Sequence, residues 1–201
     1  MHPAVIILAV AFWLFILYVL HRADLRFWKF LWGSIGSFIL LMVFVRPYVT
    51  MPLSQMVTAL SGVVGSVTDT FDAYFKYAII YVPTADSSIT LQIDMECSGV
   101  IEIMAFVSLL AFFNVYDRFE KVVVGIGSVL LIMLFNALRI VIICEIVHFF
   151  GVDAYGIAHT YIGRIVFYAL TVLMYFYVFT RSQVIRMKVG EFRYDHAADG
   201  A

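Results

Sequence analysis

Charged residues are scarce in this chain. Only 13% of its 201 residues are Asp, Glu, Lys or Arg, whereas a soluble domain contains about a quarter. Hydrophobic residues make up 64% of the sequence, which is more apolar surface than one soluble core of this length buries. The formal net charge of -1 offers no basic surface to a nucleic acid. The composition therefore excludes a soluble domain, predicts no nucleic-acid partner and indicates an integral membrane protein.

Cysteine is nearly absent, because the chain has only Cys97 and Cys144. Two cysteines make neither a disulfide framework nor a zinc or CxxC pattern, although a single bridge between them stays open as an alternative. Glu145 and His148 have the Glu-x-x-His spacing of half a metal site, but no second copy of that motif exists. We therefore expect no metal and no other cofactor.

Long apolar runs fill most of the chain. A helix needs about 20 residues to cross a hydrocarbon core of about 30 Å. No basic residue precedes the first run, so we expect a retained helix rather than a cleaved signal peptide. The prediction is an all-α polytopic membrane protein, one integral membrane domain over residues 1–201 with about five transmembrane helices. These are Ala4–Leu20, Phe27–Val45, Val100–Val115, Val122–Val147 and Tyr161–Thr180.

The basic residues predict the orientation of these helices. Cytoplasmic loops of membrane proteins are enriched in Lys and Arg. With the N-terminus outside and the C-terminus inside, nine of the 13 basic residues are cytoplasmic. They are Arg22, Arg26, Lys29, Arg118, Lys121, Arg181, Arg186, Lys188 and Arg193. We therefore expect a multi-pass protein of the plasma membrane, whose cytoplasmic tail from about residue 181 to 201 contacts inner-leaflet lipids.

The long connection between the second and third apolar runs, about residues 46–96, is then extracytoplasmic. Its first part, Leu53–Tyr77, mixes apolar and polar residues and predicts an amphipathic helix on the outer surface. A re-entrant or spanning segment around Met56–Val67 is the alternative. The second part, Ala78–Val82 and Ile89–Ile93, resembles a β-hairpin that leads directly to Cys97.

Three reactive side chains fall at one depth, near the outer ends of three different apolar runs. They are Cys97, Arg139 and His159. Arg139 follows Val122 by 17 residues, a helical rise of about 26 Å that brings it close to the outer boundary. Ionisable groups inside a membrane are costly and usually face a partner or a cavity. We therefore expect these three side chains to share one site.

Each of the three has a chemical role and an ordinary alternative. The start of a helix and nearby cations lower the pKa of a thiol such as Cys97, whereas Asp94 and Glu96 raise it. The rigid donor fork of Arg139 suits a developing oxyanion, and His159 suits a general base and acid. The alternatives are a buried structural cysteine, a snorkelling arginine and a surface histidine.

Several neighbours are candidates for supporting or substrate-binding roles. Asn136 lies about one turn before Arg139 on the same helix face and either orients the site or packs. Arg164 either pairs with Glu102 or binds a substrate carboxylate or a lipid phosphate. Glu96 and Ser98 flank the cysteine and complete this set.

In this order, the three motifs resemble the exosortase/archaeosortase family, and the compact chain is similar to the branch called exosortase G. The resemblance extends over about Asp94 to Arg164. The motifs are Glu96-Cys97-Ser98-Gly99, Asn136-Ala137-Leu138-Arg139 and Gly156-Ile157-Ala158-His159.

The resemblance implies a polytopic membrane enzyme similar to a cysteine transpeptidase or protease. Its substrate is then an exported protein with a C-terminal sorting signal, which comprises a recognition motif, a transmembrane helix and a basic cytoplasmic end. Cys97 would attack the scissile carbonyl at the outer face, Arg139 would stabilise the oxyanion and His159 would transfer the proton. The thioester would pass to an amine or hydroxyl acceptor, such as a lipid or glycan, or to water.

Two other functional hypotheses stay open from the sequence. One is a non-enzymatic membrane scaffold or transporter subunit, in which Arg139 and His159 serve stability alone. The other is a thiol-redox membrane protein that uses Cys97 and Cys144.

Overall fold

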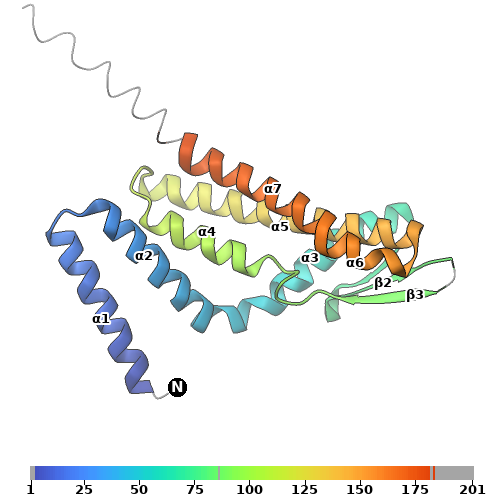
Figure 1. Ribbon diagram of the computed structural model, residues 1–201, viewed down its shortest axis with the longest axis horizontal. Coiled ribbons are helices and arrows are strands. Elements are labelled where there is room, and N and C mark those ends of the chain that lie inside the picture. Colours follow the sequence, from blue (N-terminus) through green and yellow to red (C-terminus); the bar gives the residue numbers. More distant parts are fainter. Residues whose placement is uncertain (1–2, 86, 182, 184–201) are drawn as a thin grey trace, which may run out of the picture.

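A helical hairpin begins the chain and lies at one end of the molecule (Figure 1). The computed structural model describes residues 3–85, 87–181 and 183. Helix α1 (Pro3–Arg22) and helix α2 (Arg26–Leu40) are joined by a tight turn in which Asp24 adopts a left-handed conformation with φ 51°. Aspartate tolerates this conformation better than most residues because its short side chain bonds locally.

Helix α2 continues without a break into helix α3 (Arg46–Thr68). A π-helical turn, η1 (Leu41–Val45), joins the two helices. Pro47 is tolerated because it lies in the first turn of α3. The helix ends at Asp69, whose left-handed backbone donates its N–H to the carbonyl of Gly65.

The prediction of a separate surface helix over Leu53–Tyr77 is therefore wrong at both ends. No turn-forming pair interrupts residues 40–53, so the helix of the second apolar run simply extends through them. Residues 69–77 leave the helix, because the left-handed turn at Asp69 reverses the chain.

A three-stranded antiparallel sheet follows α3 and covers the opposite end of the molecule (Figure 1). Strands β2 (Ile79–Pro83) and β3 (Ser88–Gln92) form the predicted hairpin, with Ile80 opposite Leu91. Strand β1 (Asp72–Tyr74) is not predictable from the residue pattern, because three residues are too few for a period of two. A single-turn helix, η2 (Phe75–Tyr77), connects β1 to β2. The sheet packs its buried residues on α3 and α5.

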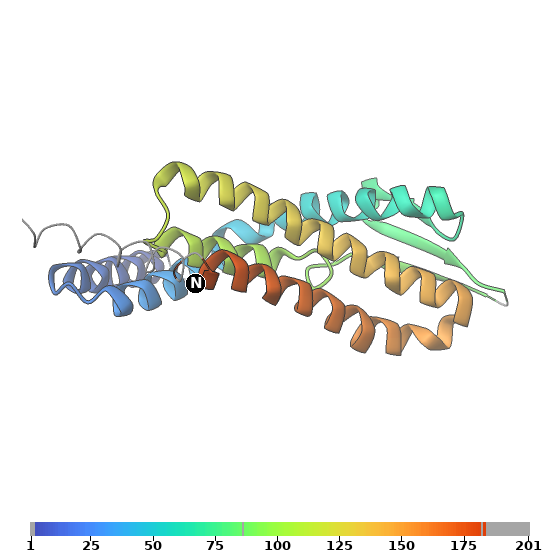
Figure 2. The same cartoon turned by 90° about the horizontal axis from the view of Figure 1, so that it is seen from above.

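The remaining helices form the body of the molecule. Helix α4 (Val100–Phe112) is followed by α5 (Arg118–Phe150), whose N-terminus is closed by a capping box between Asp117 and Glu120. A further helical run returns antiparallel to α5, and Figure 2 shows the two side by side. Helix α5 also packs on α3 and α4, so it is the central helix. The returning run comprises η3 (Val152–Ala154), α6 (Tyr155–Ile157), η4 (Ala158–Gly163), α7 (Arg164–Tyr175) and η5 (Phe176–Arg181).

The all-α polytopic class is confirmed. Three helical stretches are long and apolar enough to cross a membrane, namely Arg26–Thr68, Arg118–Phe150 and Val152–Arg181. Ile6–Arg22 and Val100–Phe112 are shorter apolar helices. All five predicted apolar segments are helical, except that residues 113–115 form the turn after α4. The orientation stays a prediction, and Arg186, Lys188 and Arg193 of the predicted cytoplasmic tail lie outside the described residues.

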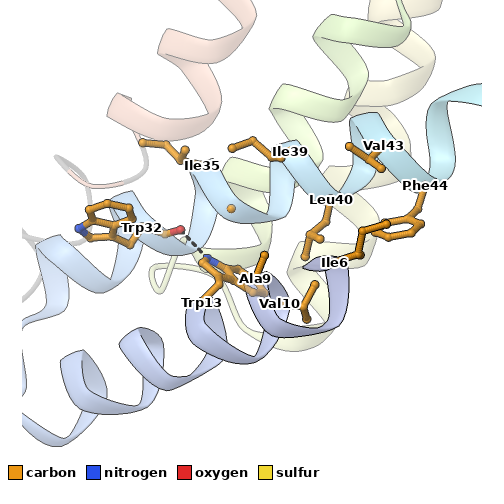
Figure 3. Close-up of a pocket in the computed structure, with 11 residues that line it drawn as sticks. Ile6, Ala9, Val10, Trp13, Trp32, Ile35, Ile39, Leu40, Val43 and Phe44 are labelled. Carbon is orange, nitrogen blue, oxygen red and sulfur yellow. Dashed lines mark hydrogen bonds between the residues drawn. The ribbon is translucent and has the colours of Figure 1, made fainter. Parts of the chain in front are cut away.

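An apolar crevice separates α1 from α2 and η1 (Figure 3). Its volume is about 260 Å³, and no titratable side chain lines it. The Trp13 indole Nε1 donates to the Trp32 carbonyl at 3.0 Å and holds the two helices together. The crevice therefore belongs to helix packing, and the candidate chemistry lies elsewhere.

Gly65 provides a test of how the chain that leads into the sheet meets α3. A Cβ at Gly65 would collide with the carbonyl oxygen of Phe71, which is backbone and cannot rotate away. We expect Gly65→Ala to lower the free energy of unfolding by about 1–3 kcal/mol, the usual cost of overpacking. Gly127→Ala is the matched control, since no atom lies within 4 Å of its Cβ position. Thermal unfolding in detergent should show a lower Tm for Gly65→Ala alone, and equal Tm values for both variants would contradict this packing.

Candidate functional site

Cys97 lies in a tight turn between β3 and α4. The Asp94 Oδ1 atom accepts hydrogen bonds from the backbone N–H groups of Glu96 (3.0 Å) and Cys97 (3.2 Å). Aspartate commonly closes a turn in this way. Ser98 Oγ donates to a carbonyl of the same turn, and Gly99 supplies the left-handed residue with φ 73° at which α4 starts. The local sequence therefore fixes the backbone on both sides of the cysteine.

Two side chains of α5 donate hydrogen bonds to the backbone of this turn. Asn136 Nδ2 donates to the carbonyl of Cys97, and Arg139 Nη1 donates to the carbonyl of Glu96 at 3.3 Å. Asn136 is fully buried and Arg139 is only 3% exposed. Two consecutive carbonyls of the turn are thus bound by two side chains that lie one helical turn apart on α5.

The sulfur of Cys97 meets two further nitrogen groups. His159 Nε2 lies 3.4 Å from Cys97 Sγ, and Arg139 Nη2 lies 3.9 Å from the same sulfur. The three residues come from the turn before α4, from the middle of α5 and from the π-helical turn η4. The structure therefore brings together the three side chains that the sequence places at one depth.

Two buried polar atoms at this site lack a partner within the described part of the chain. They are Arg139 Nε and Asn136 Oδ1. The guanidinium also faces the ring of Phe167, with 5.8 Å between its central carbon and the ring centroid. Buried polar groups are normally hydrogen-bonded, so donor and acceptor capacity remains here for a water or a ligand.

Arg164 forms an ion pair with Glu96 rather than with Glu102. The distance from Arg164 Nη2 to Glu96 Oε2 is 3.7 Å, and both side chains are partly exposed to solvent. Such a pair contributes little stability because solvent screens it. The backbone carbonyl of Glu102, in the first turn of α4, accepts a hydrogen bond from the Tyr175 hydroxyl. Arg164 and Glu96 thus lie beside the cysteine turn and are free to exchange partners.

Burial controls the ionisation of the cysteine. Removal from water raises the pKa of Cys97 to about 11, and the carboxylates of Asp94 and Glu96 act in the same direction. The Arg139 guanidinium opposes this shift without overcoming it. At neutral pH the group is therefore a protonated thiol, and the lowering that a helix start and nearby cations suggest is outweighed.

Glu145 and His148 of α5 connect this helix to the end of α3 and to the hairpin. Glu145 Oε1 accepts hydrogen bonds from the hydroxyls of Thr68 and Thr70, and His148 Nδ1 lies 2.7 Å from the carbonyl of Pro83. The described residues contain no cluster of three or more metal-ligating side chains. Cys144 is fully buried, and both cysteines are free thiols. Glu145 thus links the end of α3 to α5, and His148 links strand β2 to α5.

Sequence reasoning used Asp94 only as a charge and missed Tyr155. Asp94 binds two N–H groups of the cysteine turn, and an aspartate at the start of a tight turn is a recognisable signal. The ring of Tyr155 stacks on that of His159 with centroids 5.3 Å apart and an interplanar angle of 23°. Their spacing of four residues, which brings side chains together on a helix, is the signal that would have found the pair.

Comparison with known proteins gives one match. A family model described as transmembrane exosortase (Exosortase_EpsH) matches residues 2–176, which include all three motifs and most of the chain. No curated protein and no solved structure matches the chain. The predicted resemblance to the exosortase family is thereby confirmed, and the chain belongs to the transmembrane exosortase family, while the roles of Cys97, Arg139 and His159 stay predictions.

Proposed function

We propose that this protein is a membrane-embedded cysteine transpeptidase or protease that cleaves the C-terminal sorting signals of exported proteins. The observation that carries the proposal is the approach of His159 Nε2 to Cys97 Sγ at 3.4 Å, beside the Arg139 guanidinium. A nucleophile and a base in contact are the signature of covalent catalysis. The membership in the transmembrane exosortase family supports the same reaction class.

The first half of the reaction forms a thioester. Because the thiol of Cys97 is protonated, His159 Nε2 takes its proton while the sulfur bonds to the scissile carbonyl carbon. The carbonyl oxygen gains the electron pair and is stabilised by Arg139 Nη2. The C–N bond then breaks, and His159 returns the proton to the leaving amine.

The second half releases the product. An amine or hydroxyl acceptor, such as a lipid headgroup or a glycan, gives its proton to His159 and attacks the thioester. The C–S bond breaks, and the sulfur recovers a proton. Water in the same position gives hydrolysis, so the nature of the acceptor decides between transfer and cleavage.

The supporting residues act on backbone position and on substrate contacts. Asn136 holds the Cys97 carbonyl and thereby sets the direction of the sulfur. Glu96 and Arg164 form a solvent-accessible ion pair that a charged substrate group can replace. Ser98 closes the turn, and Glu102 lies in the first turn of α4, which follows that turn directly.

The reaction takes place at the extracytoplasmic face of the plasma membrane in this proposal. The excess of Lys and Arg in the predicted cytoplasmic loops supports that orientation. A substrate whose scissile bond lies just outside its own transmembrane helix would present that bond at the depth of Cys97. The exported protein is thus the partner, and the surrounding membrane lipids complete the site.

Replacement of Cys97 by alanine in the cells that produce the protein is the direct test of the function. We expect at least one exported protein to retain its C-terminal transmembrane segment in the Cys97→Ala strain, as detected by mass spectrometry of membrane fractions. Cys144→Ala is the control and should process normally, because Cys144 is buried in packing. Added hydroxylamine should intercept the thioester and leave a hydroxamate at the new C-terminus. Unchanged processing in Cys97→Ala would refute the proposal.

The raised pKa of Cys97 predicts a particular pH dependence of alkylation. Only the thiolate reacts, so below a pKa of about 11 the rate should rise about tenfold per pH unit. In a Cys144→Ala background, iodoacetamide labelling should therefore climb from pH 7 to pH 9.5 without a plateau. A plateau below pH 8 would indicate a preformed thiolate instead, and the double variant lacking both cysteines gives the blank.

Arg139→Lys tests whether the guanidinium fork is needed. Arg139 reaches the Glu96 carbonyl with one nitrogen and approaches the sulfur with the other, which a single ammonium cannot do. We expect kcat to fall by about 10²–10³-fold, the usual cost of a lost oxyanion donor. Arg164→Lys is the matched control and should stay within a few-fold, since its exposed ion pair tolerates the exchange. A kcat of Arg139→Lys within a few-fold of the wild type would show that positive charge alone suffices and would contradict the need for the guanidinium fork.

A further inference from the structure

His159 lacks the third residue that usually orients a catalytic imidazole. In nucleophile–base pairs, the base is commonly held by a hydrogen bond from its second nitrogen to a carboxylate or amide. His159 Nε2 faces Cys97 Sγ, but within residues 3–85, 87–181 and 183 no protein group bonds its Nδ1. Something else must keep the imidazole plane directed at the sulfur.

The ring of Tyr155 is the group that meets the imidazole. The two rings are nearly parallel, with an interplanar angle of 23° and centroids 5.3 Å apart. Tyr155 itself packs against the buried cluster that contains Cys97 and Ala158, so its position is fixed from the protein side. The stack therefore connects the imidazole to the same core that holds the nucleophile.

The backbone around His159 brings its side chain close to that of Tyr155. His159 lies in the π-helical turn η4 (Ala158–Gly163), two residues after the end of α6. A π-helical turn is wider than an α-helical turn and occurs often at functional sites. It places the histidine beside the cysteine turn, and the ring of Tyr155, four residues earlier in the same helical run, is the aromatic group that meets the imidazole.

We propose that Tyr155 is the positioning residue of this site, whose ring stacks on His159 and keeps its Nε2 in line with Cys97 Sγ. The inference rests on the proposed function, in which His159 transfers the proton. The face of the phenol ring also suits the imidazolium that forms after proton transfer, because aromatic faces attract cations. In this proposal the aromatic ring of Tyr155, rather than its hydroxyl, positions His159.

Turnover of the exported substrate tests this role. Tyr155→Leu should lower kcat by about three- to tenfold, the effect of losing a typical aromatic pair, with little change in KM. Tyr155→Phe keeps the ring and should restore the wild-type rate. If Tyr155→Leu does not fold, Tyr155→Met replaces it. Wild-type turnover in the ring-free variant, or an equal loss in Tyr155→Phe, overturns the inference.

A spectroscopic test is independent of the reaction. In protein labelled with ¹³C at histidine Cε1, the resonance of His159, assigned with His159→Gln, should be shifted upfield by the ring current of Tyr155. That shift should disappear in Tyr155→Leu and remain in Tyr155→Phe. A His159 resonance that is identical in wild type and Tyr155→Leu overturns the stack.

The two failures are distinguishable. If Cys97→Ala still processes substrate, the proposed function fails, and the resonance alone decides whether Tyr155 holds His159. If Cys97→Ala is inactive while Tyr155→Leu turns over normally, the function stands and the role of Tyr155 is refuted.

Discussion

The site depends on the hydrogen bonds that side chains of α5 donate to the backbone of the cysteine turn. Asn136 and Arg139 bind the carbonyls of Cys97 and Glu96, and both donors are almost fully buried. A buried carbonyl that loses its donor costs about 1–3 kcal/mol, so the turn has little freedom to leave α5. The cost of burying a guanidinium inside an apolar bundle is thereby partly offset by contacts that also aim the nucleophile.

Burial of the sulfur has a chemical consequence. A thiol with a pKa of about 11 is almost fully protonated at neutral pH, and is thus protected from oxidation and adventitious alkylation at rest. In the proposed reaction this protonated thiol needs a base, and the imidazole of His159 is the nitrogen group 3.4 Å from the sulfur. The low reactivity of the Cys97 thiol and its contact with His159 are therefore both consequences of the buried position of the sulfur.

Much of the site could be predicted from the sequence, because the membrane restricts depth. Counting residues along an apolar helix gives the height of a side chain, and three costly polar groups at one height have few ways to be satisfied except by each other. The ion pair of Arg164 could not be assigned this way. Glu96 and Glu102 lie six residues apart in sequence, and only the geometry of the turn decides which carboxylate is within reach.

The wrongly predicted parts of the fold are the continuous helix Arg26–Thr68 and the strand Asp72–Tyr74. Both depend on how the segment after α3 folds back on α3 and α5. The hydropathy of a segment indicates whether it contacts lipid. A segment that packs on protein near the membrane boundary mixes apolar and polar residues, and the same mixture is typical of a helix on the membrane surface.

The three-stranded sheet links this segment to the cysteine turn. Strand β3 leads into the Asp94 turn, and the N–H of Ile93 bonds back to the carbonyl of Ala78 just before that turn begins. Glu145 and His148 attach α3 and the hairpin to α5 about two turns beyond Arg139. The cysteine turn is therefore attached to the sheet through β3 and to α5 through Asn136 and Arg139. Both attachments rest on α5, so one helix sets the positions of the Cys97 sulfur and the Arg139 guanidinium relative to each other.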